Sequence, residues 1–123
     1  MDFKILADAG INITEALKRF EGNDVLYARM LKKFVEEPTY VNLERAVQQN
    51  DMREVLKASH TLKGLCGILS LSALFELFST QVSLIRSGEY AKALEMMSEI
   101  DRQYQKTIRA ITEWLNAVDL SAV

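Results

Sequence analysis

The feature that most constrains the fold is an apolar stripe in the last third of the chain. Eight apolar residues lie three or four positions apart along it: Ala93, Met97, Ile100, Tyr104, Ile108, Ile111, Leu115 and Val118. This spacing places all of them on one face of an α-helix. We therefore expect a helix over about 89–117, which at ~1.5 Å per residue is roughly 40 Å long and able to act as the spine of a bundle.

Earlier segments carry their own helix signals. Asn12-Ile-Thr-Glu15 has the form of a capping box, in which the first side chain accepts from free backbone N–H groups, and it predicts a short helix over about 13–20. Asp51-Met-Arg-Glu54 repeats this form and predicts the start of another helix. A further helix is expected over about 71–86, with Phe75 and its apolar neighbours in the core.

Pro38 interrupts another amphipathic segment. Asn23 or Asp24 is expected to cap a helix whose apolar positions include Leu26 and Phe34. Beyond Pro38 the apolar stripe continues out of phase, and the residue before a proline is disfavoured in the α region. We expect a kink or break near Pro38, with helix on both sides.

Composition agrees with helices and disfavours other architectures. The 123 residues include only one proline and five glycines, too few turn signals for a many-stranded β fold. The length and the 49% apolar content suit one globular domain over 1–123. We therefore expect an all-α fold, an antiparallel up-and-down four-helix bundle with an extra short N-terminal helix.

Scarce residue types and the charge narrow the function. One histidine and one cysteine provide too few ligands for a usual zinc site and allow no disulfide within the chain. A net charge of −2 gives no electrostatic reason to expect nucleic acid or an anionic membrane. No apolar run reaches transmembrane length and the first residues lack a signal peptide's pattern, so we expect a cytoplasmic protein.

The one histidine, His60, lies on the wrong face for a core residue. With Leu62 at the centre of the buried stripe and about 100° per residue, His60 is about 160° away, on the solvent side. Gly64 and Gly67 fall within roughly 40° of it. Basic residues flank the same side: Arg53, Lys57 and Lys63. Cys66 falls on the core stripe, where we expect it to pack and not to react.

The two glycines beside His60 need an explanation. A glycine inside a helix costs about 1 kcal/mol against alanine, and the benefit that we expect here is open access to the imidazole. The basic neighbours would attract an anion or an acidic partner. The ordinary alternative is an exposed histidine without a role on a solvated face, with Gly67 starting the last turn of its helix.

The residues around His60 resemble a known family. Ser59-His60-Thr-Leu-Lys63-Gly64, continued by Leu65-Cys66-Gly67 and ending at Arg86-Ser87-Gly88, is similar to the histidine-containing phosphotransfer (HPt) domain. The resemblance extends upstream to residues 16–22, to Tyr27, Leu31 and Phe34, and to Ala46 with Asn50-Asp51. It covers about residues 12–115. The His-x-x-Lys-Gly core is short, and the flanking blocks in register make the match specific.

The resemblance implies a phosphocarrier without an ATP site of its own. His60 would accept a phosphoryl group from a receiver-domain aspartate and pass it to another receiver domain. Lys63 would stabilise the charge of the phosphoryl group, and Gly64 would leave room for the receiver's loops. A neutral imidazole keeps one ring nitrogen with a free lone pair, as a nucleophile requires.

The resemblance also implies the partners. These are receiver domains of response regulators and a hybrid sensor histidine kinase, with neither nucleic acid nor a membrane. Mg²⁺ is expected only in the receiver domain, so the chain would need no cofactor or metal of its own. The residues expected to contact a partner are Arg53, Leu56, Lys57, Gly67, Ile68 and Gln81.

The chain departs from the family pattern near the histidine. Ile68 stands where the family often has a small polar residue, and its apolar surface would alter partner choice. Ser70 stands where a glycine is common, and we expect it to cap the next helix. Val82 replaces a polar residue that commonly orients the histidine. The adjacent Gln81 is then either an ordinary satisfied core glutamine or a residue that reaches the histidine helix.

Two other functions remain open at this point. The first is a degenerate HPt-like adaptor that binds a receiver or kinase without being phosphorylated. The retention of His60, Lys63 and Gly64 argues against it, and the departures at Ile68 and Ser70 leave it open. The second is an unrelated helical interaction domain in which the motif is a coincidence.

Overall fold

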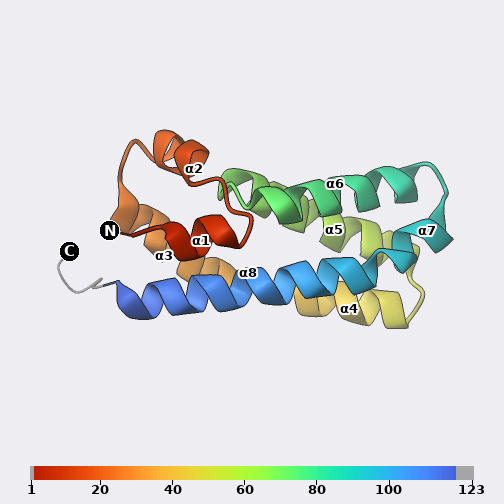
Figure 1. Ribbon diagram of the computed structural model, residues 1–123. Coiled ribbons are helices and arrows are strands. Elements are labelled where there is room, and N and C mark those ends of the chain that lie inside the picture. The colour runs from red at the N-terminus through yellow and green to blue at the C-terminus, as the bar shows by residue number, and fades with distance from the viewer. Residues whose placement is uncertain (1, 119–123) are drawn as a thin grey trace.

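The computed structural model describes residues 2–118 and is helical along nearly all of this length (Figure 1). The single domain expected over 1–123 therefore includes Met1 and residues 119–123, which lie outside the described part. The helices are α1 (Lys4–Asp8), α2 (Ile13–Arg19), α3 (Asp24–Val35), α4 (Thr39–Gln48), α5 (Met52–Ile68), α6 (Ser72–Arg86), α7 (Tyr90–Glu95) and α8 (Met97–Ala117).

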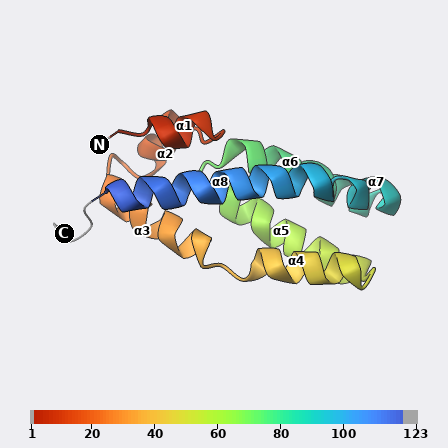
Figure 2. The same cartoon turned by 60° about the horizontal axis from the view of Figure 1, so that its bottom comes forward.

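The helices form an antiparallel bundle, which confirms the predicted all-α class. Figures 1 and 2 show α4, α5, α6 and the first half of α8 side by side at one end of an elongated molecule. At the other end, α1 and α3 pack on the second half of α8, and α2 contacts α3 (Figures 1 and 2). The long helix thus acts as the spine, as its apolar stripe predicts. Two short helices, not one, precede the bundle, and α1 was not predicted.

Side-chain caps start three helices at the predicted positions. Asn12 Oδ1 accepts from Glu15 N at 3.1 Å, and Asn23 Oδ1 accepts from Leu26 N at 3.0 Å. Asp51 Oδ1 accepts from Glu54 N at 3.2 Å at the start of α5. Each cap satisfies a backbone donor that the first turn of a helix leaves free.

The break expected at Pro38 separates α3 from α4. Beyond it, Tyr40 stacks on Tyr104 of α8 with ring centroids 3.7 Å apart. The Tyr40 hydroxyl donates to Asp101 Oδ1 at 2.8 Å. These contacts hold the start of α4 against the spine, so the two halves of the interrupted segment pack on the same long helix.

The C-terminal helix is anchored and also divided. Trp114 is buried, and its ring N–H donates to the Asp2 carbonyl at 2.9 Å, which anchors the end of α8 to the N-terminal segment. The helix expected over 89–117 is split at Met96 into α7 and α8. Next to this split, Gln81 Nε2 donates to the Ala93 carbonyl at 3.1 Å. A side chain that bonds a helix carbonyl in this way is a known cause of local breaks.

Two apolar residues predicted for the core are exposed instead. Leu26 lies on the outer side of α3, whose buried residues are Tyr27, Ala28, Leu31 and Phe34. Phe75 is 37% exposed at the surface of α6. Both residues belong to the apolar face of their helix, but the neighbouring helices bury only part of that face. No helix within residues 2–118 combines the length and the apolar character that crossing a membrane requires.

Candidate functional site

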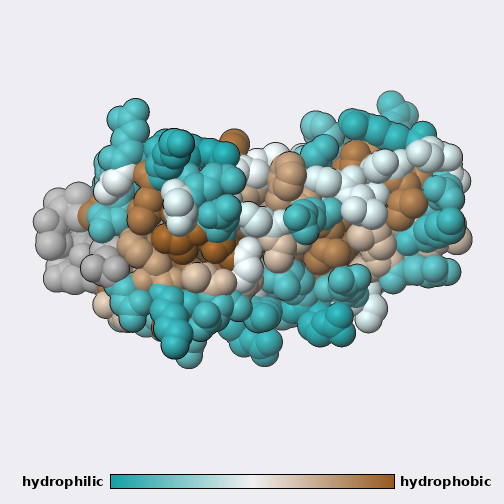
Figure 3. All heavy atoms as spheres, turned by 45° about the horizontal axis from the view of Figure 1, so that its top comes forward, coloured by the Kyte–Doolittle hydropathy of each residue, from teal (hydrophilic) through white to brown (hydrophobic). Residues whose placement is uncertain are grey.

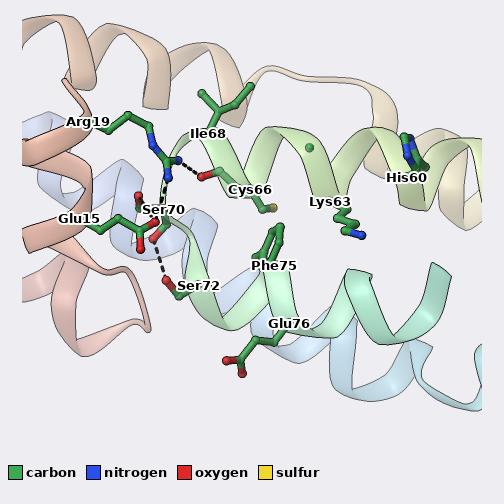
Figure 4. Close-up of a pocket in the computed structure, with 12 residues that line it drawn as sticks. Glu15, Arg19, His60, Lys63, Cys66, Ile68, Ser70, Ser72, Phe75 and Glu76 are labelled. Atoms are coloured by element: carbon green, nitrogen blue, oxygen red, sulfur yellow. Dashed lines mark hydrogen bonds and ion pairs between the residues drawn. The ribbon is translucent and has the colours of Figure 1, made fainter. Parts of the chain in front are cut away.

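A groove of about 640 Å³ lies along the C-terminal half of α5, between α2 and α6. Figure 4 shows His60 at one end of it and Arg19 with Glu15 at the other. Its lining comes from α2, α5, α6 and the α5–α6 link: Glu15, Arg19, His60, Lys63, Gly64, Cys66, Gly67, Ile68, Ser70, Ser72, Phe75 and Glu76. The histidine face predicted from the helical pattern is therefore one end of a longer surface.

His60 occupies the exposed side of α5, as the helical wheel predicts. Lys63, one turn later, is half-buried and extends across toward α6 in Figure 4. Its ammonium group therefore lies on the groove side of the helix, where an anion bound at the imidazole would meet a positive charge. Arg53 and Lys57 are exposed earlier on α5, and Leu56 is half-buried. The basic residues and the histidine thus share one helix.

The two glycines differ in what surrounds them. A Cβ atom added at Gly64 would have no heavy atom of the neighbouring described residues within 4 Å, so packing within residues 2–118 does not require a glycine there. A Cβ atom added at Gly67 would lie 3.1 Å from Cε1 of Phe75 and 3.2 Å from Cδ1. Close packing of an aromatic ring explains Gly67, whereas no packing contact of this kind explains Gly64. Both were expected to serve access.

The opposite side of α5 is buried and contains a polar network. The Ser59 hydroxyl donates to Gln81 Oε1 at 2.8 Å, and both residues are fully buried. Gln81 Nε2 also lies 3.2 Å from the Met97 sulfur. Gln81 thus reaches the histidine helix, at the residue before His60, and its polar atoms have partners. Its expected direct contact with a partner protein is wrong for this structure, because the side chain has no exposed surface.

Cys66 lies on this buried side, directly below the groove. The residue is fully buried, and burial raises the pKa of its thiol because the thiolate would lose its hydration. A protonated, enclosed thiol packs and does not act as a nucleophile at neutral pH. This agrees with the packing role predicted from its place on the stripe.

The last turn of α5 is held by the N-terminal segment. Arg19 Nη1 donates to the Gly67 carbonyl, and the Tyr27 hydroxyl donates to the Leu69 carbonyl at 2.7 Å. Asn12 N donates to the Ser70 carbonyl at 2.9 Å. The carbonyl groups of Gly67, in the last turn of α5, and of Leu69 and Ser70, just after it, therefore accept hydrogen bonds from the N-terminal segment. Such bonds satisfy the free carbonyls that the C-terminus of a helix leaves.

Ser70 does not cap α6, which corrects the prediction. Leu71 is the N-cap of α6 and makes no side-chain cap bond. The Ser70 hydroxyl donates instead to Glu15 Oε1 at 2.9 Å, back toward α2. Its backbone has φ 57°, in the left-handed region that glycine adopts most easily. The bonds from Asn12 and to Glu15 hold a serine in that conformation.

Comparison with known families shows the family to which the chain belongs. The model of the Hpt domain matches residues 29–119, well over half of the chain. The chain belongs to the Hpt domain family. This excludes the unrelated helical domain considered above, because the motif around His60 lies inside the matched region. The chain matches no curated protein and no solved structure.

Membership connects the chain with phosphorelay signalling, because Hpt domains are a family of phosphocarriers that interact with receiver domains and kinases. The matched Hpt region contains α4 to α8, with His60, Lys63 and Gly64 on α5. Helices α1 and α2, and with them Glu15 and Arg19, precede the matched region.

The groove residues missed by the sequence reasoning are Glu15, Arg19, Ser72, Phe75 and Glu76. Phe75 was hidden by its fit to the core stripe. Nothing in the local pattern marked Glu15 or Arg19, because their proximity to α5 depends on how α2 packs. Arg53, Leu56 and Lys57 lie outside the groove lining, and their expected contact with a partner stays a prediction.

Proposed function

We propose that this Hpt domain accepts a phosphoryl group on His60 from a receiver-domain aspartyl phosphate and passes it to another receiver domain. The observation that carries the proposal is the exposed His60 with the unobstructed Gly64 one turn away. A glycine in mid-helix that no neighbour requires is costly, and access to the imidazole is the benefit that offsets this cost.

The transfer uses the imidazole as a nucleophile. The lone pair of one ring nitrogen attacks phosphorus, so that a P–N bond forms while the P–O bond to the receiver's aspartate breaks. The electron pair of the broken bond stays on the departing carboxylate, and the other ring nitrogen carries the ring proton. Onward transfer reverses these events on the aspartate of a second receiver.

Charge stabilisation during the transfer comes from both proteins. Lys63 supplies a positive charge from the groove side of α5. Phosphoryl transfer depends on cations and metal ions around the phosphoryl oxygens. The Mg²⁺ ion is expected from the receiver domain, and His60 and Lys63 are the contribution of this chain.

The test is a labelling experiment with the His60→Gln variant as control. A phosphorylated receiver domain is mixed with the chain, and the phosphate that moves to the chain is tested for stability. We expect acid-labile, base-stable phosphate on the wild type and none on His60→Gln, because the chain has no other histidine. Label that persists on the variant would move the site elsewhere.

Small-molecule phosphorylation separates the proposal from the adaptor alternative. Phosphoramidate donates a phosphoryl group to an accessible imidazole without a partner protein. We expect it to label the wild type, and the labelled chain to pass its phosphate to a receiver domain. A chain that binds receivers but takes no label from phosphorylated receivers or from phosphoramidate would be a degenerate adaptor.

A further inference from the structure

The groove extends well beyond the residues that handle the phosphoryl group. Gly67 lies seven residues after His60, which is ~10 Å along the axis of α5. Arg19 from α2 bonds the Gly67 carbonyl at that far end. A partner large enough to be a folded domain that reaches His60 also covers this end of the groove.

The far end has an apolar part with unusual exposure. Ile68 is 54% exposed and Phe75 is 37% exposed, and the two side chains flank Gly67. In Figure 3, atoms of intermediate to hydrophobic residues (white to brown) lie in the middle of the molecule, between more hydrophilic surfaces (teal) on either side. The Phe75 ring packs over Gly67, so this ring and Ile68 present the apolar surface that a partner's apolar side chain can contact.

The end wall of the groove carries a charged group with spare bonding capacity. The Arg19 guanidinium donates to the Gly67 carbonyl and to Glu15 Oε1, the latter at 3.2 Å. A guanidinium has five N–H donors in a planar fork that matches a carboxylate, more than these two acceptors use. The Arg19–Glu15 pair is partly exposed, with side chains 42% and 47% accessible, and such pairs exchange partners at little cost.

We propose that Arg19, at the end of the groove farthest from His60, selects the receiver domain by pairing with an acidic side chain on the receiver's docking face. The receiver that fits has this acidic residue roughly 10 Å from its phosphorylated aspartate. It also has an apolar residue beside the acidic one, which packs on the exposed surfaces of Ile68 and Phe75.

The inference rests on the proposed function, because it takes a receiver domain as the occupant of the groove. Continuity supports that occupant, since His60 and Arg19 line one groove. The groove lining contains two basic residues, Lys63 and Arg19, together with the acidic Glu15 and Glu76. Glu15 competes with the receiver's acidic residue for Arg19, and the strength of docking depends on that competition.

The experiment measures kcat/KM for phosphoryl transfer from a receiver domain that labels the wild type. For Arg19→Glu we expect a loss of about tenfold, because a favourable charge pair becomes a repulsive one. Lys18→Glu is the matched control, since it makes the same charge change on an exposed residue of α2 outside the groove. Its transfer rate is expected to stay within about twofold of wild type.

Glu15→Gln should change the transfer rate in the opposite direction. A charge reversal on the receiver then tests whether Arg19→Glu acts through docking or through a loss of stability. The glutamine keeps an oxygen that can accept from Ser70 but removes the charge that competes for Arg19. We expect transfer equal to or faster than wild type. Replacing the receiver's acidic residue by arginine should restore transfer to Arg19→Glu, which a general loss of stability in that variant would not allow.

Phosphoramidate labelling of His60 separates the two proposals. It needs no partner, so we expect Arg19→Glu to be labelled at the wild-type rate while its transfer from the receiver falls. Equal transfer by wild type, Arg19→Glu and Lys18→Glu would overturn the role of Arg19 and leave the proposed function intact. No label on the wild type from any receiver or from phosphoramidate would overturn the proposed function itself.

Discussion

The two sides of α5 place neighbouring residues in opposite environments. Ser59 is fully buried and bonded to Gln81, while the next residue, His60, faces solvent. Leu62 and Cys66 continue the buried side, and Gly64 continues the exposed side. Substitutions on one side should therefore change the free energy of unfolding, and substitutions on the other should change phosphoryl transfer. Each prediction below tests that separation.

The exposed side is tested most severely by Gly64→Gln. We expect kcat/KM for transfer from a receiver domain to fall by about 100-fold, which corresponds to about 2.7 kcal/mol, because the side chain stands where the receiver must approach. The free energy of unfolding should rise by about 0.5 kcal/mol, since glutamine favours a helix more than glycine does. Transfer kinetics and urea unfolding measure the two effects.

Phosphoramidate and a smaller substitution are the controls for Gly64→Gln. The small donor should still label His60 in this variant, because only a protein partner is blocked. Gly64→Ala adds a Cβ atom that meets nothing within 4 Å, so its transfer should fall much less. If Gly64→Gln transferred phosphate at the wild-type rate, access would not be the reason for this glycine.

The buried side is tested by Gln81→Leu. The substitution leaves the Ser59 hydroxyl and the Ala93 carbonyl without the amide, and we expect it to lower the free energy of unfolding by about 1–3 kcal/mol. Transfer by the folded variant should stay within about twofold of wild type, because the network lies on the side of α5 away from the groove. Thermal unfolding and transfer kinetics provide the measurements.

Ser59→Ala completes a double-mutant cycle with Gln81→Leu. A coupling energy between the two substitutions measures the Ser59–Gln81 bond in isolation from the other bonds of the amide. A large loss of transfer in Gln81→Leu, without a change in stability, would show that the buried side acts on His60. The separation of the two sides would then be wrong.

The sequence predicted the parts of the fold that depend on local patterns. The caps at Asn12, Asn23 and Asp51 lie where short motifs place them, and Pro38 ends a helix by its own covalent structure. The exposed position of His60 followed from the helical period alone. These features need no information about neighbouring helices.

The parts that were missed depend on contacts between distant segments. The division at Met96 lies beside the bond from Gln81 to Ala93, which no pattern within residues 89–117 contains. Arg19 reaches the groove because α2 packs against the end of α5. Phe75 satisfied the apolar period, and only the packing of α5 and α6 leaves it exposed.

Gly67→Ala is expected to change the free energy of unfolding least. Gly67 lies between the buried and the exposed side of α5, so this substitution tests where one side ends and the other begins. Alanine favours the helix by about 1 kcal/mol, but its Cβ atom meets the Phe75 ring at 3.1 Å. Phe75 is partly exposed and can move outward, so we expect the two effects to cancel to within about 0.5 kcal/mol.

Repeating the substitution in a Phe75→Ala background isolates the contact between Gly67 and Phe75. There Gly67→Ala should recover the full gain of about 1 kcal/mol, whereas Gly64→Ala should gain the same amount in both backgrounds. Urea unfolding of the set gives the comparison. If Gly67→Ala stabilised the chain as much as Gly64→Ala while Phe75 was present, the ring would not require a glycine beneath it. Gly67 would then join Gly64 as a residue kept small for access, and the groove between Ile68 and Phe75 would be open for the same reason as the approach to His60.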